Sequence, residues 1–301
     1  MDEVKDFSFQ KEPKLLELMM ACGAGGFQAT ELQKAAQLMK RIKEEKCTIF
    51  LAFTANMVAS GLRGIFAQMV KEGWADAIIT TGGSLDHDMI KAYKPYLLGS
   101  FGEDDKKLHQ KGINRIGNIL VPNDRYELLE EKLKPVFEEL AKRSPISPSE
   151  FAAEMGKRIK DENSFLHQAY ERKVPVFSPG ITDSAIGLQT YFVKQKYKDF
   201  AIDVTKDMKA LANIAIDAEK TAAIILGGGI SKHHTIGVNL MRGGLDYALY
   251  VSTSEAFDGS LSGAPPSEAV SWGKISEIGR YVNVRADATL AFPLIWYAAR
   301  E

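Results

Sequence analysis

The 301-residue sequence predicts an α/β fold in which helices flank a mainly parallel β-sheet. Most of its apolar, strand-like segments are followed by a loop of Gly, Ser, Thr or Asp and then by a helix-like pattern. One such pattern covers residues 56–71, where Thr54 is a suitable N-cap. This alternation indicates βαβ units and a Rossmann-like arrangement. Five apolar segments have the length and the β-branched composition of buried strands: 48–53, 76–80, 174–177, 221–226 and 247–251.

Weaker patterns complete the expected organisation. Residues 200–204 and 281–284 are expected as two further strands, the second leading into a final helix at 288–300, and the first forty residues favour helices. Between 123 and 171 the sequence becomes charged and helix-favouring, with a Pro/Ser break at 144–149. We interpret residues 1–301 as a single domain that carries a helical insertion at about 123–171.

Composition excludes several classes of protein. The chain is 45% hydrophobic and 26% charged, as expected for a globular protein with a large core, and its net charge of −1 gives no basic footprint for nucleic acid. The charged start lacks the apolar region of a signal peptide, and residues 289–299 are too short to span a bilayer and contain Pro293. We therefore expect a cytoplasmic protein without a membrane segment. Cys22 and Cys47 have no metal-ligand spacing, so we expect no metal site.

The Trp272-Gly-Lys274 tripeptide suggests a lysine nucleophile. Small, turn-forming residues at 259–266 predict a loop, after which Glu268 and Trp272 are expected on a short helical turn that carries Lys274 one or two turns onward. A carboxylate, an indole and an amine would then lie together. A lysine attacks carbon only when it is neutral, and the apolar neighbours offer burial that lowers its pKa. The alternative is an ordinary surface lysine, one of 38 Lys and Arg residues.

Two glycine-rich loops follow expected strands, Thr80-Thr-Gly-Gly-Ser84 and Leu226-Gly-Gly-Gly-Ile-Ser-Lys-His-His234. Glycines let a backbone approach a pyrophosphate, whose charge is favoured at the N-terminus of the following helix. Neither loop matches Gly-x-Gly-x-x-Gly in full. In the second loop, Lys232 occupies the final glycine position after Gly227 and Gly229. For a single loop of this kind tight turn packing is the better explanation, whereas two loops at one sheet edge favour dinucleotide binding.

Titratable side chains also fall at the expected strand ends. His233 and His234 follow the triple glycine, and either is a candidate general base. Asp183 and Asp287 follow other strands, where a carboxylate can accept a hydrogen bond from a ribose hydroxyl. An Asx turn or a helix N-cap is the alternative role for each aspartate.

In combination these segments resemble the deoxyhypusine synthase family over about residues 25–296. Many short motifs in the same order are far more specific than any one of them. The motifs are Gly26-Phe-Gln-Ala-Thr30, Thr54-Ala-Asn56 with Ser60-Gly61, Thr80-Thr-Gly-Gly83, Ser178-Pro-Gly-Ile-Thr-Asp183, Gly227-Gly-Gly229 with Lys232-His-His234, Asn239-Leu-Met-Arg242, Phe257-Asp-Gly-Ser260, Glu268-Ala-Val-Ser-Trp-Gly-Lys274 and Ala286-Asp-Ala288.

The resemblance implies an NAD-dependent transferase that moves the 4-aminobutyl group of spermidine to a lysine of the hypusine-bearing translation factor. Lys274 would form the covalent imine and His233 would act as base. Glu268 and Trp272 would bind the polyamine, with Gly259, Ser260, His87 and Asp86 as further substrate candidates. A homotetramer with shared sites is also implied. The NAD positions would be Ala55, Asn56, Ala59, Thr81, Gly82, Gly83, Asp183, Gly228, Thr253, Ser254, Asp287 and Ala288.

The sequence departs from the eukaryotic form of the family. Leu188 and Leu261 stand where that form has acids for the polyamine, and His87 replaces a glutamate of the nicotinamide region. Asp86 and Asp88 are candidates to compensate. Two alternatives stay open at this point: a homospermidine synthase-like enzyme that transfers to a small diamine, and a non-catalytic NAD-binding homologue. The amine donor, the acceptor, the oligomeric state and the role of the short N-terminal region also stay open.

Overall fold

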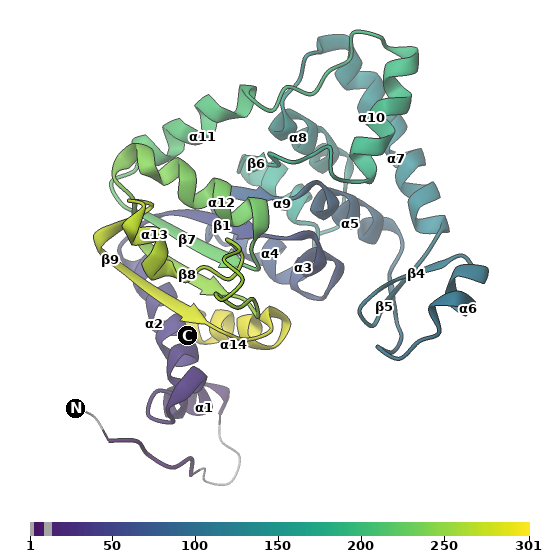
Figure 1. Ribbon diagram of the computed structural model, residues 1–301. Coiled ribbons are helices and arrows are strands. Elements are labelled where there is room, and N and C mark those ends of the chain that lie inside the picture. Colours follow the sequence, from purple (N-terminus) through teal and green to yellow (C-terminus); the bar gives the residue numbers. More distant parts are fainter. Residues whose placement is uncertain (1–2, 9–13) are drawn as a thin grey trace. The chain divides into compact units, whose positions relative to one another are not determined.

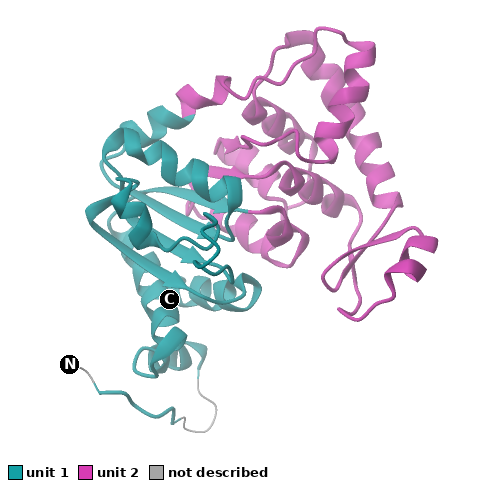
Figure 2. Cartoon of the chain, viewed as in Figure 1, with its two compact units in different colours: residues 1–53, 211–301 teal, residues 54–210 magenta. Residues whose placement is uncertain are grey.

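The computed structural model describes residues 3–8 and 14–301 (Figure 1). The chain divides into two compact units (Figure 2): unit 1 comprises Met1–Phe53 and Leu211–Glu301, and unit 2 comprises Thr54–Ala210. Helix α11 (Lys206–Ile216) runs across the second of these boundaries.

Unit 1 is a four-stranded parallel sheet with helices, in the order β1-β7-β8-β9. In Figure 1, α12 and α13 lie in front of the strands and α2 passes behind them. Helices α2 and α14 pack on each other, while α12 contacts β1 and β7, and α13 contacts β9. The elements are α1 (Leu15–Cys22), α2 (Phe27–Glu44), β1 (Thr48–Phe53), β7 (Thr221–Leu226), α12 (Gly229–Val238), η2 (Asn239–Arg242), β8 (Leu245–Val251), α13 (Pro266–Ser271), β9 (Ile275–Val284) and α14 (Ala288–Arg300).

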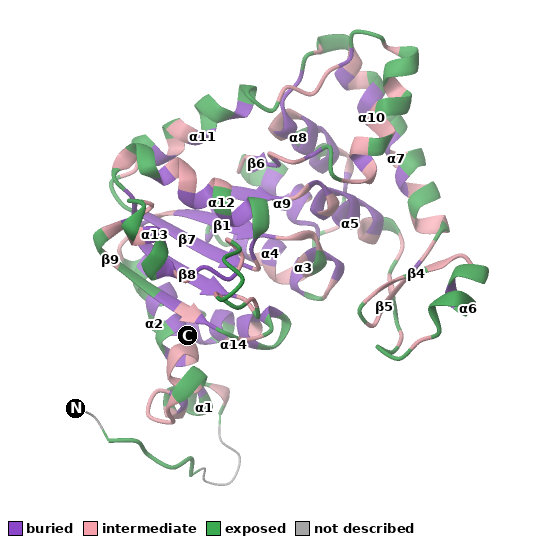
Figure 3. Cartoon of the chain, in the orientation of Figure 1, coloured by how far each residue is buried: buried purple, intermediate pink, exposed green. Residues whose placement is uncertain are grey.

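The core of unit 1 lies on the central strands. All six residues of β7 are buried, and six of the seven in β8. Figure 3 shows both strands mostly in the colour of buried residues. A strand covered on both faces needs a continuous apolar run, which Thr221–Leu226 supplies. Strand β9 instead mixes buried, partly buried and exposed positions, because it is at the end of the strand order.

Unit 2 holds a second parallel pair, in which Ile78 of β2 lies opposite Val176 of β6, and a separate antiparallel sheet in the order β3-β5-β4. Its helices include α7, α8 and α9, which occupy most of residues 123–171. The elements are α3 (Ala55–Ala59), α4 (Leu62–Lys71), β2 (Ala77–Thr80), α5 (Gly82–Tyr93), β3 (Leu97–Leu98), α6 (Asp105–Gln110), β4 (Ile113–Ile116), β5 (Ile119–Pro122), α7 (Asp124–Leu140), η1 (Ala141–Arg143), α8 (Pro148–Arg158), α9 (Phe165–Arg172), β6 (Val176–Phe177) and α10 (Ala185–Lys196).

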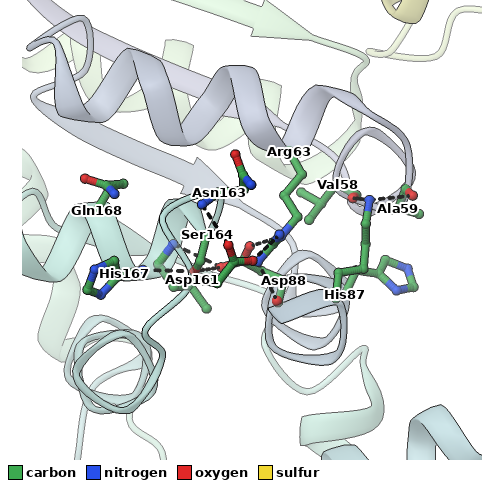
Figure 4. A network of polar contacts seen from close by, with 12 residues as sticks. Val58, Ala59, Arg63, His87, Asp88, Asp161, Asn163, Ser164, His167 and Gln168 are labelled. Carbon is green, nitrogen blue, oxygen red and sulfur yellow. Dashed lines mark hydrogen bonds and ion pairs between the residues drawn. The ribbon is translucent and has the colours of Figure 1, made fainter. Parts of the chain in front are cut away.

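A buried ionic network joins three helices of unit 2 (Figure 4). Arg63 of α4 donates from Nε to Asp88 Oδ1 of α5 at 2.5 Å and from Nη1 to Asp161 Oδ2 at 2.7 Å. The other Asp88 oxygen accepts from Ser164 Oγ at 2.5 Å and from Leu166 N at 3.0 Å, at the start of α9. Burial raises the pKa of Asp88, while the Arg63 charge opposes that shift.

The structure confirms the α/β fold class with its mainly parallel strands, and it corrects three details. The helix expected at 56–71 is broken at Ser60, whose hydroxyl donates to Met57 O at 2.6 Å and accepts from Leu62 N at 3.2 Å. Residues 200–204 form no strand; Ile202 makes a single bridge to Ile146. The antiparallel β3-β5-β4 sheet was not expected, since its strands are only two to four residues long.

Candidate active site

A cavity of about 310 Å³ in unit 1 brings together five of the residues selected from the sequence: Lys274, His233, Glu268, Trp272 and Gly259. They come from α12, from the loop after β8, from α13 and from the segment that joins α13 to β9. The remaining lining residues are Lys232, Ile236, Tyr250, Leu261, Ala264, Pro265 and Ala269.

Lys274 follows α13 and does not lie on a helix. The helix ends at Ser271, and Gly273 then adopts a left-handed φ of +67°, so the expectation that Lys274 lies one or two helical turns onward is wrong. Its backbone is fixed on both sides, because Lys274 N donates to Ala269 O at 2.9 Å and Leu245 N donates to Lys274 O at 3.0 Å. The half-buried ammonium lies 5.4 Å from the centre of the Trp272 ring.

Sequence reasoning gave no role to two buried residues of the cavity, Lys232 and Tyr250. Lys232 is 2% exposed; its Nζ donates to Ala264 O at 2.7 Å and lies 4.5 Å from the centre of the Tyr250 ring. Burial lowers the pKa of Lys232 to about 8, with Glu268 opposing the shift. The Tyr250 hydroxyl is buried and has no hydrogen-bond partner among the described residues. The position of Lys232, directly before His233 after the triple glycine, was the signal that could have found it.

The candidate base His233 and the substrate candidates Glu268 and Ser260 are all exposed to solvent. His233 and Glu268 are exposed and line the cavity from α12 and α13. Ser260 lies in an exposed turn, where its N donates to Asp258 Oδ1 at 2.7 Å, and it is not among the lining residues. Leu261 lines the cavity and packs on the core cluster that contains Ile236 and Tyr250. An apolar side chain at 261 is therefore part of the hydrophobic support below the cavity.

The glycine-rich loop before α12 fits a phosphate group. At Gly229, where α12 begins, φ is +62° and a Cβ would meet nothing within 4 Å, so the backbone faces open space. A Cβ on Gly228 would lie 2.6 Å from Ser262 Cβ and Oγ. The first amide of α12, Gly229 N, already donates to Ser262 Oγ at 2.9 Å, whereas the next amides have no intrahelical acceptor and favour an anion. These observations agree with a dinucleotide-binding loop.

The remaining NAD candidates of unit 1 lie after β8 and at the start of α14. Thr253 is exposed, and Ser254 N donates to Ser252 Oγ at 3.1 Å. Asp287 is the N-cap of α14 and accepts from Thr289 N at 2.7 Å, the alternative role considered for it, and Ala288 is buried directly after it.

The glycine-rich loop of unit 2, residues 80–84, also has little room for larger side chains. Helix α5 begins at Gly82, where a Cβ would lie 2.7 Å from Ser184 Cβ, and a Cβ on Gly83 would lie 3.0 Å from Ala55 Cβ. Thr81 is the N-cap, with an extended backbone. The other candidates are the exposed Asn56, the buried Ala59 and the exposed Asp183.

His87, Asp86 and Asp88 are buried and engaged within unit 2. Asp86 accepts from Ala185 N and Ile186 N at 2.8 and 3.1 Å, at the start of α10, and burial raises its pKa to about 7. His87 Nδ1 lies 2.7 Å from the Tyr96 hydroxyl, and burial lowers the pKa of His87 to about 4. These contacts give Asp86 and Asp88 structural roles, so they speak against compensation for missing acids. Leu188 is 59% exposed on α10.

The described residues contain neither a membrane-spanning helix nor a cluster of metal-ligating side chains. Within 3–8 and 14–301, no helix combines the length and apolar character needed to cross a bilayer. The same residues contain no group of three or more His, Cys, Asp or Glu side chains arranged to hold a metal ion.

A lysine, an indole, a carboxylate and a histidine thus share one cavity next to a glycine-rich helix start, in a protein of the α/β class. The sequence profile of deoxyhypusine synthase matches residues 15–299. The chain is 48% identical over 295 residues to "Probable deoxyhypusine synthase" of Thermococcus gammatolerans, covering 92% of this chain and 88% of the relative. It is 43% identical to the protein of the same name from Picrophilus torridus, covering 98% and 96%.

A solved structure has the same fold. The crystal structure of an Entamoeba histolytica protein named for deoxyhypusine synthase activity superimposes with a TM-score of 0.72 at 24% identity, covering 98% of this chain and 96% of that one. The chain belongs to the deoxyhypusine synthase family and is a transferase.

Proposed function

We propose that this enzyme transfers the 4-aminobutyl group of spermidine to a lysine of the hypusine-bearing translation factor, with NAD as cofactor and Lys274 as the covalent nucleophile. The observation that carries the proposal is the position of Lys274 in a cavity that also holds Trp272, Glu268 and His233, in a chain of this family.

In the proposed reaction Lys274 acts as an amine. Its nitrogen forms a bond to the imine carbon of the oxidised polyamine, the bond from that carbon to the departing diamine breaks, and the diamine leaves with a proton. His233 accepts the proton that Lys274 gives up. The acceptor lysine then takes the place of Lys274 by the same exchange, which frees the enzyme. When bound, NAD would take a hydride from the carbon beside the secondary amine and return it to the product.

The cavity has the groups that a polyamine needs. Glu268 offers a carboxylate to an ammonium group, and the Trp272 face offers a cation–π contact. The buried Tyr250 hydroxyl is available to a bound amine. Within unit 1 the candidates for NAD contacts are Gly228, Thr253, Ser254, Asp287 and Ala288. Within unit 2 they are Ala55, Asn56, Ala59, Thr81, Gly82, Gly83 and Asp183.

Leu261 supports a second candidate function. Because an apolar side chain stands in the cavity wall, Glu268 is the one carboxylate among the described lining residues. A cavity with fewer acids suits a homospermidine synthase-like enzyme that transfers the same group to a small diamine. Family membership favours the protein acceptor, and with it a cytoplasmic homotetramer.

Borohydride trapping tests the proposal. The protein is incubated with NAD and spermidine, putrescine or agmatine, reduced with borohydride and mapped by peptide mass. We expect a four-carbon amine adduct on Lys274 with spermidine and none in Lys274→Arg, while Lys40→Ala, at an exposed site on α2, reacts like the wild type. Label on the translation factor supports the first function, and homospermidine without protein labelling supports the second. A wild type without adduct contradicts both and leaves a non-catalytic NAD-binding protein.

A further inference from the structure

Helix α5 carries three charged side chains that each contact the end of a different helix in unit 2. Asp86 accepts from the first amides of α10, and Asp88 accepts from Leu166 N at the start of α9. Lys91 contacts the C-terminal end of α3, at Val58 and Ala59. Carboxylates at helix N-termini and a cation at a C-terminus complement the partial charges of those ends. Helix α5 therefore organises the helices around it.

The Lys91 contact is the most complete of the three. Its Nζ donates to Val58 O and Ala59 O, each at 2.9 Å, and to Ser60 O at 2.6 Å. An ammonium has three N–H donors, and here each has a carbonyl acceptor. These carbonyls are at the point where α3 ends and the chain turns through Ser60 and Gly61 into α4. Lys91 therefore fixes the break between α3 and α4.

The same helix positions two candidate NAD segments relative to each other. Helix α3 carries Ala55, Asn56 and Ala59, and the start of α5 carries Gly82 and Gly83. The two segments are in close contact, because a Cβ on Gly83 would lie only 3.0 Å from Ala55 Cβ. An error of about 1 Å in such a site weakens binding strongly, so the residue that holds α3 affects the affinity for the ligand.

We propose that Lys91 is a positioning residue for dinucleotide binding: its ammonium holds the end of α3 so that Ala55–Ala59 and the glycine start of α5 form one surface for NAD. This inference rests on the proposed NAD dependence. Lys91 acts through the backbone of α3 and is not itself a catalytic residue.

The surroundings of Lys91 give the inference a dependence on pH. Burial lowers the pKa of Lys91 to about 8, and the Arg63 charge acts in the same direction while Asp88 opposes it. Also facing it are the Tyr96 ring, whose centre is 5.8 Å from Nζ, and His87, whose pKa is lowered to about 4. Above pH 8 Lys91 loses its charge and one of its three donors, so α3 should be held less firmly at pH 9.5 than at pH 7.

The test is NAD affinity by calorimetry at both pH values for the wild type, Lys91→Met and Lys91→Arg, with Lys94→Met as control. Lys94 is three residues further on and pairs at the surface with Asp124. We expect a Kd about tenfold or more higher for Lys91→Met at pH 7, as removal of a charged hydrogen-bonding group implies. Lys91→Arg should keep a low Kd at both pH values, the wild-type Kd should rise at pH 9.5, and Lys94→Met should follow the wild type.

Hydrogen exchange without NAD separates this inference from the proposed function. Peptides covering residues 55–60 should exchange faster in Lys91→Met than in the wild type. A wild type that does not bind NAD contradicts the proposed function, and the exchange rates then still test whether Lys91 holds α3. Equal Kd and equal exchange in the wild type and Lys91→Met overturn the inference. If Lys91→Met does not fold, identical pH dependence in the wild type and Lys91→Arg overturns it.

Discussion

The ammonium of Lys274 lies 5.4 Å from the centre of the Trp272 ring, although only Gly273 separates the two residues in the chain. The left-handed turn at Gly273 (φ +67°) brings them together. Because Trp272 is 66% exposed, its ring is available on the solvent side to a second cation. This geometry connects the short tripeptide to the proposed recognition of a polyamine.

We expect Trp272→Ala to weaken polyamine binding with little effect on folding, since most of the ring is exposed. A cation–π contact contributes about 0.5–2 kcal/mol, so the KM for spermidine should rise roughly two- to thirtyfold. Trp272→Phe keeps an aromatic face, so its KM for spermidine should lie between those of the wild type and Trp272→Ala. Steady-state kinetics with saturating NAD measures this, and an unchanged KM in Trp272→Ala would argue against cation–π recognition.

The sequence was sufficient for features that depend on local pattern. The buried runs at 48–53 and 221–226 became β1 and β7 with the same bounds, and the helix expected at 288–300 is α14. Continuous apolar runs and an Asp at position 287 as N-cap are signals carried by neighbouring residues.

Features that depend on distant partners could not be predicted in this way. Nothing near Lys232 in the sequence indicates that its ammonium contacts the carbonyls of Ser262 and Ala264, some thirty residues later. Similarly, Asp86 was expected near a polyamine, yet its partners are the amides of Ala185 and Ile186, about one hundred residues further on. A carboxylate that caps another helix has the same local sequence as one that binds substrate.

Gly228→Ala should destabilise unit 1. The added Cβ would lie 2.6 Å from Ser262 Cβ and Oγ and 2.7 Å from its Cα, so the loop must shift. Overpacking of this kind costs about 1–3 kcal/mol. Gly237→Ala, later in α12, is a matched control because a Cβ there meets nothing within 4 Å, and alanine should stabilise the helix by up to about 1 kcal/mol. Urea unfolding of both variants checks this, and equal stability would contradict the close approach.

Arg63→Met should be strongly destabilising. It leaves the fully buried Asp88 without its cation, and removal of one partner of a buried ion pair costs about 3–5 kcal/mol. Lys71→Met removes an exposed ion pair with Glu162 between neighbouring elements, so its effect should be below about 1 kcal/mol. The free energies of unfolding in urea give both values. A loss for Arg63→Met no larger than that for Lys71→Met would show that the network in Figure 4 contributes little.

Asp86 should make the protein less stable as the pH rises. Its pKa is raised by burial from 3.8 to about 7, so the folded state binds a proton that the unfolded state has lost. The stability due to this proton is fully present below pH 3.8 and is lost as the pH rises through 7. In Asp86→Asn the group no longer titrates. Between pH 5 and pH 8 the free energy of unfolding of Asp86→Asn should therefore increase by about 2 kcal/mol relative to that of the wild type. Glu45→Gln is the control: the pKa of Glu45 is lowered to about 2, chiefly by Lys220, so this change should not alter the slope in that range. Parallel pH profiles for the wild type and Asp86→Asn would mean that the Asp86 carboxylate is already ionised in the folded protein at pH 5, stabilised by the amides of α10.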